Sequence, residues 1–177
     1  MKRSTTVLLG IAAGASVLFA AAADADNKHR LERFETQLSG LHEDPLVLST
    51  TGAGRWKATL DAAGTTLNWE LSYTGLEGTV TQAHVHFGGN HQSGGIMVFF
   101  CTNLGNGPAG TQACPAAPAT VTGSITAADV IGPAGQGISA GDFAALLTAL
   151  RTGTAYANVH STLYPGGEIR GQVRRDW

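Results

Sequence analysis

Several sequence motifs that mark well-known enzyme classes are missing from this chain of 177 residues. It contains no P-loop, no H-E-x-x-H pair and no EF-hand loop, and we expect no strand-to-helix elbow carrying a nucleophilic serine. Asp61, Asp129 and Asp142 fall where turns or a helix start are expected, so we interpret them as capping and loop residues. The sequence therefore assigns no catalytic residue.

An excess of positive charge is also missing. The net charge is −2, and only 14% of the residues are charged. Nucleic acids and anionic membrane surfaces attract proteins through clustered Lys and Arg side chains, and this balance of charge gives no indication of such a partner. We therefore predict no nucleic-acid partner.

Long hydrophobic runs are absent after the first 25 residues. The one long run, residues 7–23, follows two basic residues and ends in an Ala-Asp-Ala pattern at residues 23–25. This arrangement is typical of a secretory signal peptide. We therefore predict a signal peptide over residues 1–25 and a single mature domain over residues 26–177.

A membrane anchor is the weaker alternative for the same segment. The run is rich in Ala and Gly, which favours a cleaved signal peptide over a transmembrane helix. No cysteine follows the run as a site for lipid attachment. We expect a secreted or periplasmic protein that keeps no membrane anchor after cleavage.

Cysteine occurs only twice, as Cys101 and Cys114. The segment between them is rich in Gly, Pro and Asn and is expected to be an exposed loop. In an exported chain two such cysteines are expected to form a disulfide rather than remain free thiols.

Short segments of alternating polar and apolar residues, separated by glycine-bearing turns, dominate the remaining sequence. About eight strands at this spacing predict an all-β sandwich or barrel in one domain. The predicted strands are 32–39, 54–60, 65–73, 79–87, 95–101, 119–126, 154–161 and 167–174.

One segment, residues 139–153, has the periodicity of an amphipathic helix instead. Its apolar residues Phe143, Leu146, Leu147 and Leu150 are spaced three and four apart, which predicts a helix over about 140–151. We expect Ser139 to cap its first turn and Gly153 to end it. Because the apolar stripe needs a core to cover, we interpret the helix as a lid over one open end of the sandwich.

Two histidines flank a valine in the predicted strand 79–87. Side chains alternate across a strand, so Ala83, Val85 and Phe87 share one face and His84 and His86 share the other. The small and aliphatic set is expected to face the core. We therefore predict that both histidines lie on the outer face, where solvent or an ion can reach them.

A third histidine, His160, occupies the corresponding face of strand 154–161. If core-facing Val159 pairs with core-facing Ile169, His160 lies opposite Glu168 and Asn158 lies opposite Arg170. Glu168 would then orient His160 by accepting its second ring proton, as carboxylates do beside metal-bound histidines. Arg170, on the same face, would pair with Glu168 or attract an anion. The alternative is that Glu168 and Arg170 form only an exposed salt bridge of little energetic value.

Together these residues predict a metal site made of His84, His86 and His160. His91, in the glycine-rich segment 88–95, is a candidate fourth ligand, and a solvated turn is the alternative there. Three neutral imidazoles suit Cu(II) or Zn(II). The site requires the two strands to be neighbours; otherwise the histidines are ordinary residues on unrelated strands.

The chain also resembles the CHRD (chordin-type) domain family. The resemblance rests on "FETQLSGLHEDP" at 34–45, "LNWELSYTGLEGTVTQAHVHFG" at 67–88 and "AYANVHSTLYPGGEIRGQV" at 155–173. It implies a single Greek-key β-sandwich, immunoglobulin-like or superoxide-dismutase-like, but it implies little about chemistry, because one fold serves many functions.

A second, local resemblance is to the copper-binding strand of copper/zinc superoxide dismutases. It implies copper-ligand roles for His84, His86 and His160, and a substrate-guiding role for Arg170. Two departures stand against a full match: no zinc loop with its own His and Asp ligands is recognisable, and the two cysteines are too close in sequence for that family's long-range disulfide.

Three functions follow from these observations. The first is an exported CHRD-domain binding protein that carries a surface copper (or zinc) site of three histidines, with another extracytoplasmic protein as a further candidate partner. The second is a copper-only enzyme similar to superoxide dismutase. The third is a metal-free protein-interaction module.

Overall fold

The computed structural model describes residues 31–176, so the predicted signal peptide lies outside the described residues. Within this range the chain forms nine strands, one α-helix, α2, over Phe143–Thr152, and three short 3-10 segments. The strands are β1 Arg33–Ser39, β2 Ala53–Leu60, β3 Leu67–Thr74, β4 Val80–Phe87, β5 Ile96–Thr102, β6 Ala119–Ile125, β7 Ala155–Ser161, β8 Ile169–Gln172 and β9 Arg174–Asp176. The predicted all-β class with one helix is confirmed.

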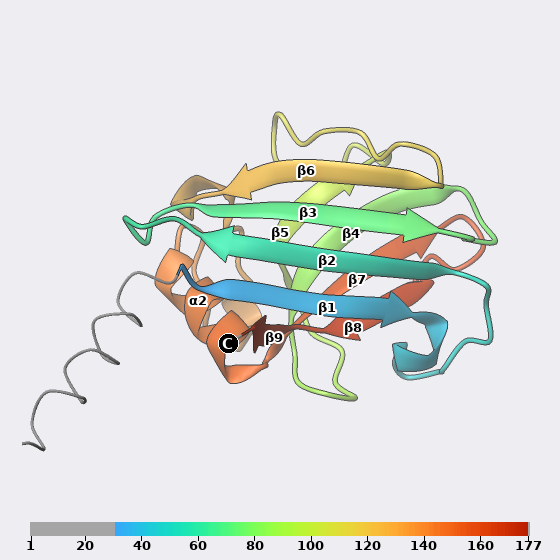
Figure 1. Ribbon diagram of the computed structural model, residues 1–177, viewed down its shortest axis with the longest axis horizontal. Helices are drawn as coiled ribbons and strands as arrows, with labels where there is room; N and C mark the ends of the chain where they lie inside the picture. Colours follow the sequence, from blue (N-terminus) through green and yellow to red (C-terminus); the bar gives the residue numbers. More distant parts are fainter. Residues whose placement is uncertain (1–30, 177) are drawn as a thin grey trace, which may run out of the picture. The chain divides into compact units, whose positions relative to one another are not determined.

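The strands form one antiparallel sheet that folds over on itself. Its order is β5-β4-β7-β8-β1-β2-β3-β6, with β9 paired to β1. Figure 1 shows β6, β3, β2 and β1 as a front layer, with β5, β4, β7 and β8 behind them. The layers join between β8 and β1, where a single pair, Arg170 and Ser39, is in register. The apolar faces of the two layers enclose the core, as in a β-sandwich.

The core contains the residues that the alternation assigned to it. Ala83 and Val85 of β4, Val159 of β7 and Ile169 of β8 are all buried in one hydrophobic cluster. Aromatic rings fill its other side: Phe100 of β5 lies 4.6 Å from Trp69 and 5.7 Å from Trp56 between ring centroids. Gly123 of β6 is needed there, because a Cβ at this position would lie 2.7 Å from the Trp69 ring.

The predicted strand 167–174 is divided at the buried residue Val173. Before it, β8 pairs with β7, and after it, β9 pairs with β1. The amide of Val173 donates to the carbonyl of Ala155, so the chain turns from one partner to the other without losing its backbone hydrogen bond. One continuous run of alternating residues thus serves two different neighbours.

Helix α2 lies at one end of the sandwich, as expected for a lid (Figure 1). The face that it turns to the core consists of its own buried residues Leu146, Leu147 and Leu150. Gly153 ends the helix in the left-handed conformation, with φ of 70°. The predicted cap was wrong: Asp142, not Ser139, accepts the hydrogen bond from the amide of Ala145. The helix begins at Phe143, so Ser139 lies too far from its first turn to cap it.

The outermost strands of the sheet, β5 and β6, are joined by one side chain. Gln112 donates from Nε2 to the carbonyl of Phe100 on β5 at 3.2 Å and to that of Thr122 on β6 at 3.1 Å. Gln112 belongs to the loop between Cys101 and Cys114, whose predicted disulfide is confirmed.

Candidate metal centre

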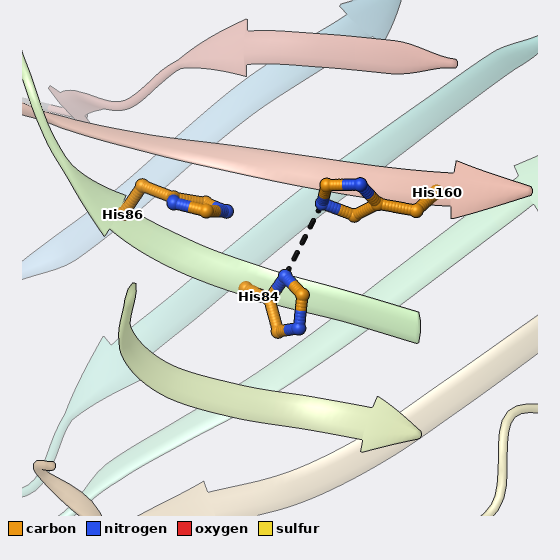
Figure 2. Close-up of side chains that lie close together, drawn as sticks. All are labelled: His84, His86 and His160. Atoms are coloured by element: carbon orange, nitrogen blue, oxygen red, sulfur yellow. Dashed lines mark hydrogen bonds between the residues drawn. The ribbon is translucent and has the colours of Figure 1, made fainter. Parts of the chain in front are cut away.

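The three predicted ligands come together because β4 and β7 are hydrogen-bonded neighbours. In their register Gln82 lies opposite His160, and His84 lies opposite Asn158. His160 is therefore diagonal to His84, at a spacing that long side chains bridge. Figure 2 shows the rings of His84, His86 and His160 turned toward one another. The predicted adjacency of the two strands is confirmed.

The distances within this cluster suit one small ion. One ligand nitrogen from each ring lies within 4.8 Å of the other two. The closest pair, Nδ1 of His84 and Nε2 of His160, is 3.2 Å apart. Two nitrogens bound tetrahedrally to one Zn(II) or Cu(II) at about 2.0 to 2.1 Å lie about 3.3 Å apart. The observed separation is close to that value.

The burial of the cluster corrects the predicted outer face. The exposed fractions are 0% for His84, 9% for His86 and 6% for His160, so solvent scarcely reaches these rings. The alternation correctly placed the histidines opposite the core, but on that face Gly94 of the β4–β5 loop contacts His86, and Pro165 of the β7–β8 turn contacts His160. The ring of Phe99 on β5 packs against His84. The site is a buried one, not a surface one.

Backbone carbonyls fix two of the three rings. Nδ1 of His86 donates to the carbonyl of Gly94 at 2.9 Å, and Nδ1 of His160 donates to the carbonyl of Pro165 at 3.0 Å. A carbonyl only accepts, so both Nδ1 atoms carry the proton and both Nε2 atoms keep a lone pair. Nε2 of His86 is buried and has no partner among the described residues. An unpaired buried acceptor facing two other imidazoles fits a metal ligand.

Desolvation keeps the cluster neutral. Burial, with a smaller contribution from the neighbouring imidazoles, lowers the pKa of His84 to about 2. Burial likewise lowers the pKa of His86 to about 4, although its bond to Gly94 opposes the shift. The pKa of His160 is also lowered, again through burial. Neutral imidazole is the form that binds a metal ion, so protons compete weakly at neutral pH.

Glu168 does not have the predicted role. The register that placed it near His160 is confirmed, since Val159 pairs with Ile169. Its carboxylate, however, is fully buried and accepts from the amides of Glu77 at 2.6 Å and Gly78 at 3.4 Å. The carbonyl of Pro165, and not the carboxylate of Glu168, accepts the Nδ1 proton of His160. Glu168 instead fastens the segment that leads into β4.

Arg170 is also buried, with 3% of its surface exposed, and its Nη1 lies 4.0 Å from a carboxylate oxygen of Asp44, so it does not form an exposed salt bridge. Its Nη2 donates to the carbonyls of Gly89 at 3.1 Å and Gln92 at 2.9 Å. Its guanidinium carbon lies 3.6 Å from the centroid of the Tyr156 ring. Arg170 thus ties the β4–β5 loop to β8 and does not pair with Glu168.

His91 lies outside the cluster. It is exposed in the β4–β5 loop and has a left-handed backbone, with φ of 56°. The group of ligand atoms within 4.8 Å includes His84, His86 and His160 but not His91.

Sequence reasoning gave no role to three residues beside the cluster: Tyr156, Gly94 and Glu43. Glu43 is buried, and its carboxylate accepts from Nδ2 of Asn158 at 2.8 Å. Burial raises the pKa of Glu43 to about 7, against the lowering effect of that hydrogen bond. Alternation along β7 identified the face of Tyr156 and Asn158, but no local pattern shows which loops cover that face.

A serine-elbow pattern does occur in the sequence, at Gly137-Ile138-Ser139-Ala140-Gly141. Its structure differs from a nucleophile elbow, which requires a strand directly before the serine. Here the 3-10 segment Ala134–Gln136 precedes it, and Ser139 is exposed in a loop. The pattern therefore assigns no nucleophile.

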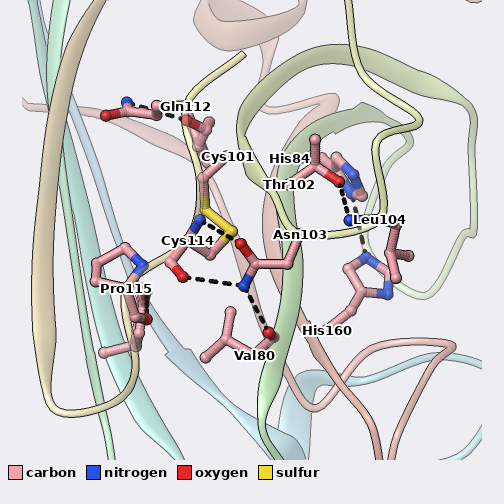
Figure 3. Close-up of a disulfide and its surroundings, with 12 residues drawn as sticks. Val80, His84, Cys101, Thr102, Asn103, Leu104, Gln112, Cys114, Pro115 and His160 are labelled. Carbon is pink, nitrogen blue, oxygen red and sulfur yellow. Dashed lines mark hydrogen bonds between the residues drawn. A yellow bond between two sulfur atoms is a disulfide. The ribbon is translucent and has the colours of Figure 1, made fainter.

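The disulfide lies on the strand that flanks the cluster (Figure 3). On β5, Cys101 pairs with Ala83 and Phe99 pairs with His84. Asn103 fastens the disulfide loop to β4, because its Nδ2 donates at 3.0 Å to the carbonyls of both Val80 and Cys114. The loop thus supports the strand that carries two of the three histidines.

Residues 34–173 match the family model of the CHRD domain, so the chain belongs to the CHRD domain family. No curated protein and no solved structure is similar enough to the chain to count as a match. Among residues 31–176, none of the helices has the length and apolar character needed to cross a membrane.

Proposed function

We propose that this protein is an exported CHRD-domain protein that binds one copper or zinc ion through His84, His86 and His160. The observation that carries the proposal is the convergence of three buried, neutral imidazoles whose nitrogens lie within 4.8 Å of one another. Buried polar atoms normally have partners, and an unpaired one costs about 1 to 3 kcal/mol. A bound ion would supply the missing partner of His86 Nε2.

Export is supported by the signal-peptide pattern over residues 1–25 and by the disulfide, which persists in oxidising compartments. Copper is the preferred ion because of the local similarity of "HVHFGGN" to a copper-binding strand, while three imidazoles suit zinc equally well.

Metal titration of the mature chain, residues 26–177, tests the proposal. We expect one Cu(II) or Zn(II) per chain, and a Cu(II) EPR spectrum typical of nitrogen ligands. His160→Ala should weaken binding by more than the about 10- to 100-fold that accompanies loss of an outer hydrogen-bond partner. His91→Ala is the matched control and should bind as the wild type does.

If the wild type binds neither metal at micromolar concentration, the proposed site is refuted. The metal-free protein-interaction module is then the function that remains. Binding that survives His160→Ala unchanged would refute the cross-strand part of the site.

A copper enzyme similar to superoxide dismutase is a second candidate, favoured by one observation. Three protein ligands would leave the fourth position of a tetrahedral ion to a small molecule, as in catalytic metal sites. Superoxide consumption by the copper-loaded protein, compared with the same concentration of free copper, decides between carrier and enzyme. Turnover no faster than that of the free ion would exclude the enzyme.

A further inference from the structure

Three side chains from neighbouring strands form a stack beside the metal centre: His86 of β4, Tyr156 of β7 and Arg170 of β8. The rings of His86 and Tyr156 are parallel within 2°, with centroids 4.8 Å apart. The Arg170 guanidinium lies over the same Tyr156 ring at 3.6 Å. Because β7 lies between β4 and β8, Tyr156 is the middle layer of this stack.

The stack also holds the loop that covers it. The hydroxyl of Tyr156 accepts from the amide of Gly94 at 3.1 Å. The carbonyl of the same residue accepts the Nδ1 proton of His86 at 2.9 Å. Arg170 fixes the other part of the loop through the carbonyls of Gly89 and Gln92. Gly94, whose carbonyl sets the tautomer of His86, is therefore held through its own amide by Tyr156, while Arg170 holds the loop on its N-terminal side.

The position of Gly94 leaves little freedom to this arrangement. A Cβ at this residue would lie 1.6 Å from the carbonyl oxygen of Phe87. The close approach of the two backbone segments brings the Gly94 carbonyl within reach of His86. Tyr156 and Arg170 are themselves buried, with exposed fractions of 4% and 3%, so both act from fixed positions.

We infer that Tyr156 and Arg170 are positioning residues of the metal centre, which act through Gly94 to hold His86 with Nδ1 protonated and Nε2 directed at His84 and His160. This inference rests on the proposed metal binding for its use, but the ring orientation and tautomer are properties of the metal-free protein. Neither residue is proposed as a ligand of the ion. They prepare one ligand in advance, which reduces the ordering needed when the ion binds.

The first test uses the metal-free protein. Long-range ¹H–¹⁵N NMR correlations report which nitrogen of His86 carries the proton. We expect the Nδ1-protonated form in the wild type, and a mixture of tautomers in Tyr156→Leu and Arg170→Met. Arg170→Lys keeps a donor toward the loop carbonyls and should restore most of the Nδ1-protonated form.

The second test uses Cu(II) affinity and the EPR spectrum. Tyr156→Phe keeps the ring stack but removes the bond to the Gly94 amide, so we expect an affinity loss of about 10-fold with an altered spectrum. Tyr73→Phe is the matched control: Tyr73 is a buried tyrosine whose hydroxyl donates to the carbonyl of Pro115 at 2.6 Å, away from the histidine cluster. It should leave affinity and spectrum unchanged.

The inference is overturned if Tyr156→Leu and Arg170→Met fold, keep the wild-type tautomer of His86 and bind copper with the wild-type spectrum. A wild type that binds no metal refutes the proposed function separately. The NMR comparison still decides in that case whether Tyr156 and Arg170 set the His86 ring.

Discussion

Nδ1 of His84 lies 3.2 Å from Nε2 of His160, although the two residues are 76 positions apart in the chain. The pairing of β4 with β7 produces this contact, and loops that cover both strands keep it from water. An isolated pair of histidines on a strand has no such partner. The third imidazole and the burial together turn the pair into a candidate centre for a metal ion.

Acid should destabilise the metal-free protein between pH 6.5 and 5. The folded-state pKa values of the three histidines lie below the ordinary value of 6.5, so the unfolded chain takes up protons that the folded chain excludes. Each such proton removes up to about 1.4 kcal/mol of stability per pH unit. Denaturant unfolding in the presence of a chelator, at several pH values, measures this loss.

Glu43 should oppose that loss. Its folded-state pKa is raised to about 7, so its contribution to stability is complete below pH 4.5 and disappears as the pH rises toward 7. Three histidines outweigh one glutamate, and stability should still fall on acidification. Glu43→Gln keeps an acceptor for Asn158 and should make the fall steeper. A flat profile in both proteins would show that the folded imidazoles already accept protons in this range.

Gly94→Ala should damage stability and metal binding together. The added Cβ would lie 1.6 Å from the carbonyl oxygen of Phe87, so the β4–β5 loop must move and take the Gly94 carbonyl with it. We expect a loss of about 1 to 3 kcal/mol, as for other overpacked positions, and weaker Cu(II) binding. Gly135→Ala is the control, because its Cβ would meet nothing within 4 Å. Thermal melts and copper titrations of both variants check the prediction.

Glu168→Gln should reduce stability but not metal affinity. The buried carboxylate accepts from two backbone amides, and a side-chain amide satisfies only one of them. The expected loss is about 1 to 3 kcal/mol by denaturant unfolding. Glu70→Gln, on an exposed ion pair with Lys57, is the near-neutral control. A fall in copper affinity of tenfold or more in Glu168→Gln would contradict this prediction. It would instead support the role that the sequence assigned to Glu168, which is to orient His160.

Replacing both cysteines by alanine should cost about 3 kcal/mol, the value expected for a disulfide that closes a loop of this length. The bond joins residues 13 positions apart and is not part of the histidine cluster. The variant, once folded, should therefore bind Cu(II) with nearly the wild-type affinity. Unfolding curves and copper titrations of the double variant test both statements, without a reductant that would also reduce the copper. A loss of copper binding in the folded variant would contradict the second.

The sequence predicted the parts of the structure that depend on alternation along single strands. Every predicted strand is present, and the matching of core-facing Val159 with Ile169 gave the correct register of β7 and β8. The same reasoning placed His84, His86 and His160 on the face opposite the core in two strands, and it predicted one site on the condition that these strands are neighbours, which the pairing of β4 with β7 fulfils.

The burial of the histidines was not predictable in this way. It depends on the β4–β5 loop, which is held by Arg170 and Tyr156 from strands far along the chain. A glycine-rich loop has no periodicity from which its path follows, so neither the Gly94 carbonyl at His86 nor the Pro165 carbonyl at His160 was expected. Glu168 was assigned to His160 from the strand register alone. Its carboxylate instead accepts hydrogen bonds from the backbone amides of Glu77 and Gly78, which have no strand partner in that register.

The bridge made by Gln112 has a consequence for how separate molecules meet. The outermost strands of an open sheet offer free backbone groups with which a strand of another chain can pair, and such pairing begins many aggregates. Gln112 occupies one carbonyl on each outermost strand, and the disulfide holds its loop between them. Each outermost strand therefore offers one backbone acceptor fewer to a strand of another chain, which opposes intermolecular strand addition in a protein whose regular structure is mostly strand.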